Sequence, residues 1–274
     1  MSIGTIIAFL GGLALFFSAI IYEASHNGMG PVTAILMYFS VPGLAMVLGG
    51  TMASAFISYE ARYVLLALKT TFRIFSSPTI NRGLLKSEVG RVIRWGYTVQ
   101  KAGLPALEAE TKKLKSTDKF LAFGLDMVIA GYSGEEVRHI LHTTIETTFG
   151  RNMVPSSILK SMGGIGPAYG MVGTLVGMVM MMANMGGDPS GIGSALSVAL
   201  LATLYGVLSA RLVWFPAAEK IKQREEIVRF RNYLVAEGLA LLAERKSPRY
   251  IQDKMNSYLD PAIHFNIDKM KQAA

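Results

Sequence analysis

The chain contains 274 residues, of which 51% are hydrophobic and only 17% are charged. This composition is too apolar for an ordinary soluble domain of that length and indicates a membrane protein. The formal net charge is +8, yet no basic stripe interleaved with aromatic residues is visible, so nucleic acid is not an expected partner. The sequence has no cysteine, which excludes disulfides, thiolate catalysis and cysteine-ligated metal sites.

Four stretches are long enough to cross a bilayer, which takes roughly 20 apolar residues in a helix. They are residues 3–22, 31–57, 155–184 and 192–215. The short segments "EASHNGMG" and "MGGDPSG" join them in pairs, so the sequence predicts two helical hairpins with tight turns. The N-terminus lacks the basic region of a secretory signal peptide, and we expect the first span to be retained.

The basic residues set the orientation. All 27 lysines and arginines lie in two blocks, residues 62–160 and 211–271. Under the positive-inside rule both blocks are cytoplasmic, so we expect a multi-pass inner (cytoplasmic) membrane protein with both termini in the cytoplasm. We predict an all-α membrane protein in four parts: a first transmembrane hairpin (1–57), a cytoplasmic helical domain (58–154), a second transmembrane hairpin (155–216) and a cytoplasmic C-terminal helical tail (217–274).

The cytoplasmic part reads as helices separated by breaks. Residues 58–75 have helical periodicity and are expected to continue the second span, up to a break that contains Pro78 and Gly83. Two further helices, over residues 85–103 and 104–131, are divided by Gly103 and Pro105. The charged residues at this break are suited to docking another protein. They are Arg94, Lys101, Glu108 and Glu110.

Three more helices complete this part, the last of them a short one over residues 248–259. Ser133 precedes Glu136 by three residues, the spacing of a capping box. An amphipathic helix follows the fourth span and stops at "SP", residues 247–248. His139, His142 and Glu146 have a spacing that could seat a metal, but histidine pairs on helix surfaces mostly face solvent, and no metal site is expected.

The third span carries a stripe of glycines. Gly166, Gly170, Gly173 and Gly177 fall on one side of a helix and form overlapping small-xxx-small steps. Gly206 belongs to a matching stripe of small residues on the fourth span. These residues predict close helix packing, either between spans three and four or between subunits.

A second line of residues runs beside the glycines. Pro167 leaves the carbonyl four residues back without its helical donor, and Thr174 places a hydroxyl two turns further along. Thr203 and Tyr205 offer hydroxyls on the fourth span. Such oxygens suit a partly dehydrated small cation, although the threonines could equally bond to their own helix carbonyls.

The spans lack acidic groups. No Asp, Glu, Lys, Arg or His lies between residues 161 and 184 or between 192 and 210. A proton or sodium relay normally needs a carboxylate inside the membrane. If the protein conducts ions, a partner must supply the acid.

Three segments resemble one known family. "GPAYGMVGTLVGMV", "NMGGDPSGIGSALSVALLATLYG" and "LVWFPAAEKI" resemble the third and fourth spans of the flagellar stator subunits MotA and PomA, in the MotA/TolQ/ExbB superfamily. The resemblance covers essentially the whole chain and is strongest over residues 163–220. It implies a homopentamer around two MotB-like or PomB-like single-span subunits, whose aspartate carries the ion, and a cytoplasmic loop that pushes on the rotor protein FliG.

The resemblance also implies residue roles. Family functional prolines map onto Pro167 and Pro216, and rotor-facing charges onto Lys101 and Glu108. Gln100 stands where relatives carry an arginine, so Arg94 or Lys101 is expected to take over that contact. The ion path is then expected to consist of Pro167, Thr174, Thr203, Tyr205 and Pro216.

The coupling ion is expected to be sodium in preference to the proton. Sodium-type relatives carry threonine in the third span and a Thr-Thr pair in the fourth, and this chain has Thr174, Ala202 and Thr203 there. No cofactor is expected besides the transported Na⁺ or H⁺.

Other functions stay open on the sequence alone. A self-contained channel or transporter is disfavoured by the missing intramembrane carboxylate, and a TolQ/ExbB-like energiser of an envelope process by the number of spans. An enzyme is not expected, because no nucleophile–base set is visible.

Overall fold

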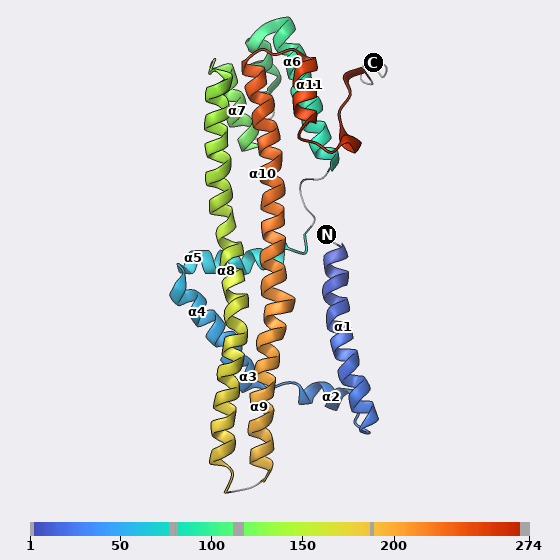
Figure 1. Cartoon of the computed structure of the whole chain (residues 1–274), viewed down its shortest axis with the longest axis vertical. Coiled ribbons are helices and arrows are strands. Elements are labelled where there is room, and N and C mark those ends of the chain that lie inside the picture. Colours follow the sequence, from blue (N-terminus) through green and yellow to red (C-terminus); the bar gives the residue numbers. More distant parts are fainter. Residues whose placement is uncertain (1–2, 77–79, 81, 112–117, 187–188, 269–274) are drawn as a thin grey trace. The chain divides into compact units, whose positions relative to one another are not determined.

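The structure, a computed structural model, describes residues 3–76, 80, 82–111, 118–186 and 189–268 (Figure 1). Every regular element in the described residues is a helix, which confirms the predicted all-α fold class. Four helical stretches are long and apolar enough to cross a membrane. They are Ile3–His26, Val41–Ser58, Gly134–Ala183 and Ser190–Ala243.

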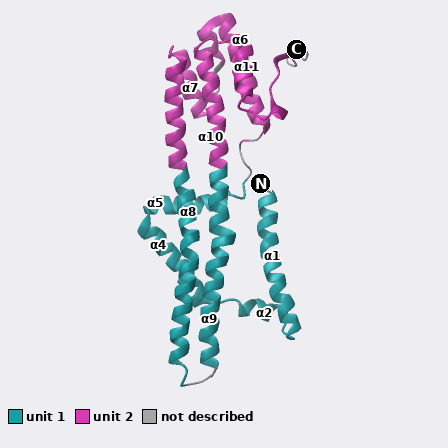
Figure 2. Cartoon of the chain, in the orientation of Figure 1, with its two compact units in different colours: residues 1–77, 153–223 teal, residues 78–152, 224–274 magenta. Residues whose placement is uncertain are grey.

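The chain forms two compact units (Figure 2). Unit 1 comprises residues 1–77 and 153–223, and unit 2 comprises residues 78–152 and 224–274. Two of the three divisions, after residues 152 and 223, fall within long helices and are therefore not marked by a loop. Residues 58–77, expected to belong to the cytoplasmic domain, cluster with the membrane spans in unit 1.

The first hairpin is more broken than the sequence suggests. α1 (Ile3–His26) is followed by α2 (Pro31–Met37), α3 (Val41–Leu44), the π-helical turn η1 (Ala45–Gly49) and α4 (Gly50–Ser58). The prediction of one helix over residues 31–57 is therefore wrong. Ser40 is extended (φ −126°, ψ 111°), and its hydroxyl caps α3 by accepting from the Gly43 amide. Pro42, which follows, could not have donated to the Tyr38 carbonyl in a continuous helix.

The helix after the second span is separate from it. Tyr59 is extended (φ −136°, ψ 151°), so α4 ends at Ser58 and α5 (Ala61–Arg73) starts anew. The expectation that residues 58–75 continue the second span is therefore wrong. α5 is strongly amphipathic: Val64, Ala67 and Thr71 are buried at spacings of three and four residues. This face packs into a hydrophobic cluster of unit 1 that includes Ile158.

The second hairpin is built from very long helices. α8 (Gly134–Ala183) runs for 50 residues through Pro155 and Pro167, so the third span and the helix expected before it are one element. The predicted capping box is confirmed, because Ser133 N donates to the Glu136 carboxylate at 2.8 Å and Glu136 N donates to Ser133 Oγ at 3.2 Å. α9 (Pro189–Leu208), the π-helical η2 (Ser209–Trp214) and α10 (Phe215–Ala243) follow. Residues 187–188 of the predicted outer turn lie outside the described residues.

Unit 2 combines parts of α8 and α10 with α6 (Arg82–Thr111), α7 (Lys119–Ile129), α11 (Pro248–Asn256) and the 3₁₀ turn η3 (Pro261–Ile263). Its core consists of buried hydrophobic side chains, among which Trp95, Leu107 and Leu239 are at most 1% exposed. Gly103 has φ 76° and divides α6 where the sequence predicts a break, because glycine tolerates this conformation. Pro78 and residues 112–117 of the predicted helices lie outside the described residues.

A buried ion network fixes α10 within unit 2. The guanidinium of Arg231 donates to Glu88 of α6 at 2.6 Å and to Asp118. Asp118 also caps α7, because its carboxylate accepts from the Leu121 amide at 3.0 Å. Arg231 and Glu88 are 7% and 2% exposed. One arginine thus ties together three helices at a site with little water.

We expect Arg231→Ala to destabilise unit 2 by about 3 kcal/mol, because the buried Glu88 carboxylate then keeps only Arg91, at 3.2 Å, and Asp118 loses its guanidinium partner. The matched control is Arg229→Ala, two residues away, whose pair with Glu146 is much more exposed to solvent and should therefore contribute less. Urea denaturation followed by Trp95 fluorescence in a Trp214→Phe background measures both. Equal losses in the two variants would contradict the proposed importance of burial.

Candidate functional site

Small residues bring α8 and α9 into close contact, side by side in unit 1 (Figure 1). A Cβ atom placed on Gly206 of α9 would lie only 2.8 Å from the carbonyl oxygen of Gly166 on α8. A Cβ atom on Gly170 would lie 3.0 Å from the Cα atom of Thr203. The further glycine contacts are Gly173 with Ala202 and Gly177 with Ala199. The glycine stripe of the third span therefore faces the fourth span of the same chain.

The two threonines of the expected ion path use their hydroxyls differently. Thr203 Oγ1 donates across the interface to the Gly170 carbonyl at 3.2 Å. Thr174 Oγ1 donates within its own helix to the Met171 carbonyl at 2.6 Å. A hydroxyl that donates its one proton keeps two lone pairs, so both oxygens retain the capacity to accept a ligand.

Tyr205 holds the break in the second span. Its hydroxyl donates to the Tyr38 carbonyl at 2.6 Å and accepts from the Ser40 amide at 2.7 Å. These are backbone groups of the non-helical residues between α2 and α3. In an apolar environment unpaired backbone groups are costly, so the tyrosine supplies what the broken helix lacks. The sequence indicates Tyr205 as a polar group of the fourth span but gives no sign of this contact.

A second tyrosine joins the spans, and the sequence analysis did not single it out. Tyr169 Oη lies 2.9 Å from Ser54 Oγ of α4. Its ring occupies the space that a side chain on Gly50 would need. The only signal in the sequence is a tyrosine among small residues in "GPAYG" and a glycine pair at residues 49–50.

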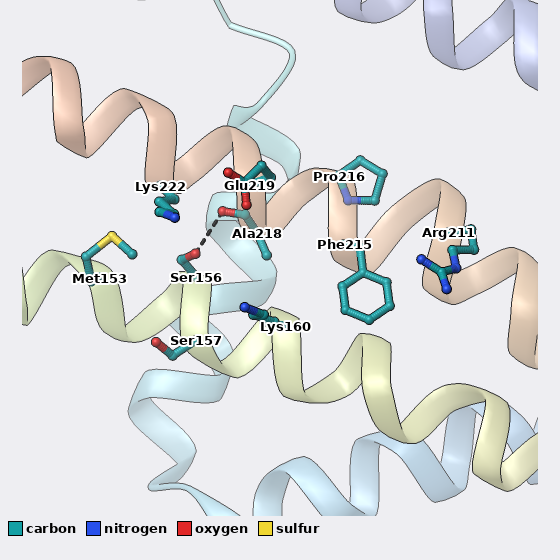
Figure 3. Close-up of a pocket in the computed structure, with 10 residues that line it drawn as sticks. All are labelled: Met153, Ser156, Ser157, Lys160, Arg211, Phe215, Pro216, Ala218, Glu219 and Lys222. Atoms are coloured by element: carbon teal, nitrogen blue, oxygen red, sulfur yellow. Dashed lines mark hydrogen bonds between the residues drawn. The ribbon is translucent and has the colours of Figure 1, made fainter.

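Pro216 lies at the edge of a cavity of about 590 Å³ between α8 and α10 in unit 1 (Figure 3). Ser156 Oγ closes one side by donating to the Ala218 carbonyl at 2.8 Å. The charged residues that line the cavity are Lys160, Arg211, Lys222 and Glu219. Three basic groups and one carboxylate make its lining net positive, which favours an incoming carboxylate over a lone cation.

The expected rotor-contact residues lie elsewhere, in unit 2. Arg94, Lys101 and Glu108 are exposed and flank the kink at Gly103. Thr98 Oγ1 donates across this kink to the Glu110 carboxylate at 3.2 Å. Arg94, Lys101 and Glu108, together called the charged corner, therefore lie around a turn that this hydrogen bond stabilises.

The histidine pair does not gather a third ligand in the described residues. Glu146, the third residue of that pattern, accepts from Arg229 at 2.8 Å and from the Tyr233 hydroxyl. The ring of His142 packs edge-on against Tyr233, with centroids 4.8 Å apart. The described residues hold no group of three potential ligands.

Comparison with known proteins identifies the family. Residues 112–232 match the MotA/TolQ/ExbB proton channel family. Motility protein A of Cereibacter sphaeroides is 30% identical over 261 residues, which are 95% of this chain and 96% of that protein. Chemotaxis protein PomA of Vibrio alginolyticus is 28% identical over 260 residues, 95% of this chain and 96% of that protein.

The long apolar helices and these matches define a membrane subunit of the ion-channel and force-coupling class, not an enzyme. The chain belongs to the MotA/TolQ/ExbB proton channel family.

Solved structures share the fold. The C. jejuni MotAB structure matches with a TM-score of 0.78 and 20% identity over 93% of this chain and 96% of that chain. The flagellar MotAB stator complex of Bacillus subtilis matches with a TM-score of 0.74 and 24% identity over 95% of this chain and 98% of that chain. The family resemblance and fold class predicted from the sequence are confirmed.

We expect Gly206→Ala to destabilise the α8–α9 pair by about 1–3 kcal/mol, because its methyl group would meet backbone that cannot move aside cheaply. Gly164→Ala is the matched control on α8: no atom lies within 4 Å of its added methyl, and alanine favours helix. Thermal unfolding of the detergent-solubilised protein compares the two. A control as unstable as Gly206→Ala would argue against a specific contact.

We expect Tyr205→Phe to speed amide hydrogen exchange at residues 38–43 by roughly fivefold or more, because a hydrogen bond is worth about 1 kcal/mol and two are lost. Tyr169→Phe serves as the control, since its hydroxyl contacts Ser54 inside α4 and not the break. Unchanged exchange in Tyr205→Phe would show that the break is held by other contacts.

Proposed function

We propose that the chain is a flagellar stator subunit that couples cation flow across the bacterial inner membrane to torque on a rotor. The observation that carries the proposal is similarity to Motility protein A and PomA over 95% of the chain. The apolar helices and the two basic blocks support an inner-membrane location with cytoplasmic termini. Assembly as a homopentamer is part of the proposal, on the strength of the family resemblance.

The proposed ion path follows the hydroxyls beside the α8–α9 contact. Thr174 and Thr203 each keep oxygen lone pairs that a partly dehydrated cation could use. Pro167 removes one amide donor from α8 directly beside Gly206, where the two backbones come closest. Tyr205, two residues after Thr203, would act by holding the second span, and Pro216 would act at the end of the path beside the polar cavity.

The proposed partner is a MotB-like or PomB-like single-span subunit that brings the ion-carrying aspartate. Residues 161–184 and 192–210 contain no ionisable group that could carry a cation across. The cavity beside Pro216, with Lys160, Arg211 and Lys222 in its lining, would attract such a carboxylate. The matching solved structures are complexes of MotA with MotB, which supports this pairing.

The proposed rotor contact is the charged corner of unit 2. Arg94, Lys101 and Glu108 are exposed around a kink that a glycine fixes, so their charges have a set geometry. Electrostatic complementarity of this kind governs partner choice and encounter rate. FliG, the rotor protein implied by the resemblance, is the proposed partner, and Gln100 leaves the contact to the neighbouring basic residues.

We propose sodium as the coupling ion and expect Thr174→Ala to weaken sodium-driven torque about fivefold or more without loss of assembly, because one oxygen ligand is lost. Thr143→Ala is the matched control: on the same helix, its hydroxyl makes the same kind of bond to its own helix, to the His139 carbonyl. Motor speed is measured in a stator-null strain carrying the chain and its partner, with external sodium titrated at fixed membrane potential.

Two outcomes would contradict different parts of the proposal: the coupling ion and the stator function. A motor whose speed ignores external sodium but collapses with an uncoupler would overturn sodium and leave a proton-driven stator. A chain that restores no motility but restores envelope integrity would favour the TolQ/ExbB-like alternative.

A further inference from the structure

Unit 1 contains a second cavity, larger than the one beside Ser156 and different in character. Its volume is about 1000 Å³, and it is lined by α1, α4, α5, η2 and α10. Most of its wall is apolar: Phe9, Leu68, Phe72 and Phe75 all contribute. The rings of Phe9 and Phe75 meet edge to face, with centroids 5.7 Å apart, so α1 is in contact with the segment after α5.

The same cavity has a basic edge. Arg211 and Lys220 line it, and no acidic side chain of the described residues does. Arg211 lines both this cavity and the one beside Ser156, and its guanidinium lies 5.3 Å from the centroid of the Phe215 ring. An apolar chamber with two positive charges at its edge is complementary to an amphiphile with an anionic head.

The surroundings place this cavity at a membrane surface. α5 buries one face in the protein, yet Leu65, Leu66 and Phe72 on it are 58%, 43% and 78% exposed. Amphipathic helices with apolar and basic residues lie in the headgroup region of a bilayer. Arg211 and Lys220 begin the second basic block, so the positive-inside rule puts this surface on the cytoplasmic leaflet, which carries anionic lipids.

We propose that this cavity binds one anionic phospholipid of the cytoplasmic leaflet. An acyl chain fills the space between Phe9, Leu68 and Phe75, and the headgroup phosphate pairs with Arg211 and Lys220. Arginine suits this task because its planar fork can donate two hydrogen bonds to one phosphate. The lipid would then pack against the π turn η2, whose residues 211–214 line the cavity.

Tryptophan fluorescence provides the test. Trp214 lines the cavity, whereas the other tryptophan, Trp95, lies in the core of unit 2 and gives a constant background. The full-length chain, purified with the subunits that remain bound to it, is placed in phosphatidylcholine nanodiscs. Phosphatidylglycerol brominated on its acyl chains is added in increasing fraction, and brominated phosphatidylcholine is added in a parallel series.

We expect brominated phosphatidylglycerol to quench Trp214 at a mole fraction about tenfold lower than brominated phosphatidylcholine, because each basic residue favours an anionic lipid. Arg211→Gln combined with Lys220→Gln should abolish this preference. The matched control is Arg62→Gln combined with Lys69→Gln, which removes two charges from α5 outside the cavity and should keep it. High salt should shrink the preference in the unsubstituted protein.

Two results would overturn the proposal. Equal quenching by both lipids would mean that the cavity meets bulk lipid without selecting a headgroup. No quenching by either would mean that another protein surface, such as a second copy of this chain, fills it. Both readouts are of binding and not of torque, so they are independent of the proposed motor function.

Discussion

The close approach of the α8 and α9 backbones is the constraint on which the membrane unit depends. At Gly166 and Gly206 no side chain separates the helices, and an added methyl would meet backbone atoms. Within lipid, apolar side chains gain little by leaving the bilayer, so helices associate through such small-residue contacts and a few hydrogen bonds. The contact brings the Thr203 hydroxyl within reach of the Gly170 carbonyl.

The hydrogen bonds of the tyrosines in unit 1 depend on this packing of α9 against α8. With α9 held against α8, the Tyr205 hydroxyl reaches the break between α2 and α3 and satisfies backbone groups at both Tyr38 and Ser40. Tyr169 connects α8 to α4 in the same way through Ser54. The second span can therefore be irregular without leaving these groups unpaired in an apolar environment.

Unit 2 is stabilised by a different interaction, the burial of a hydrophobic core. Its core consists of large side chains such as Trp95 and Leu239, which are removed from water. The Arg231 network adds a directional contact between α10, α6 and the start of α7. Unit 2, with its own hydrophobic core, and unit 1, with the close helix contact, share two helices, α8 and α10, whose residues contribute to both. This division fits the proposed function, in which an ion path is coupled to a contact with another protein.

The sequence by itself determined the features that rest on local chemistry. Apolar length gave the membrane spans, the small-residue spacing gave the packing face of the third span, Gly103 gave the kink and Ser133 with Glu136 gave the helix start. It could not give the break at Tyr38–Ser40, the separation of α5, or the roles of Tyr169 and Arg231. Those depend on partners distant in the chain: Tyr205 is more than 160 residues from Tyr38, and only the tertiary structure decides which buried group each polar side chain meets.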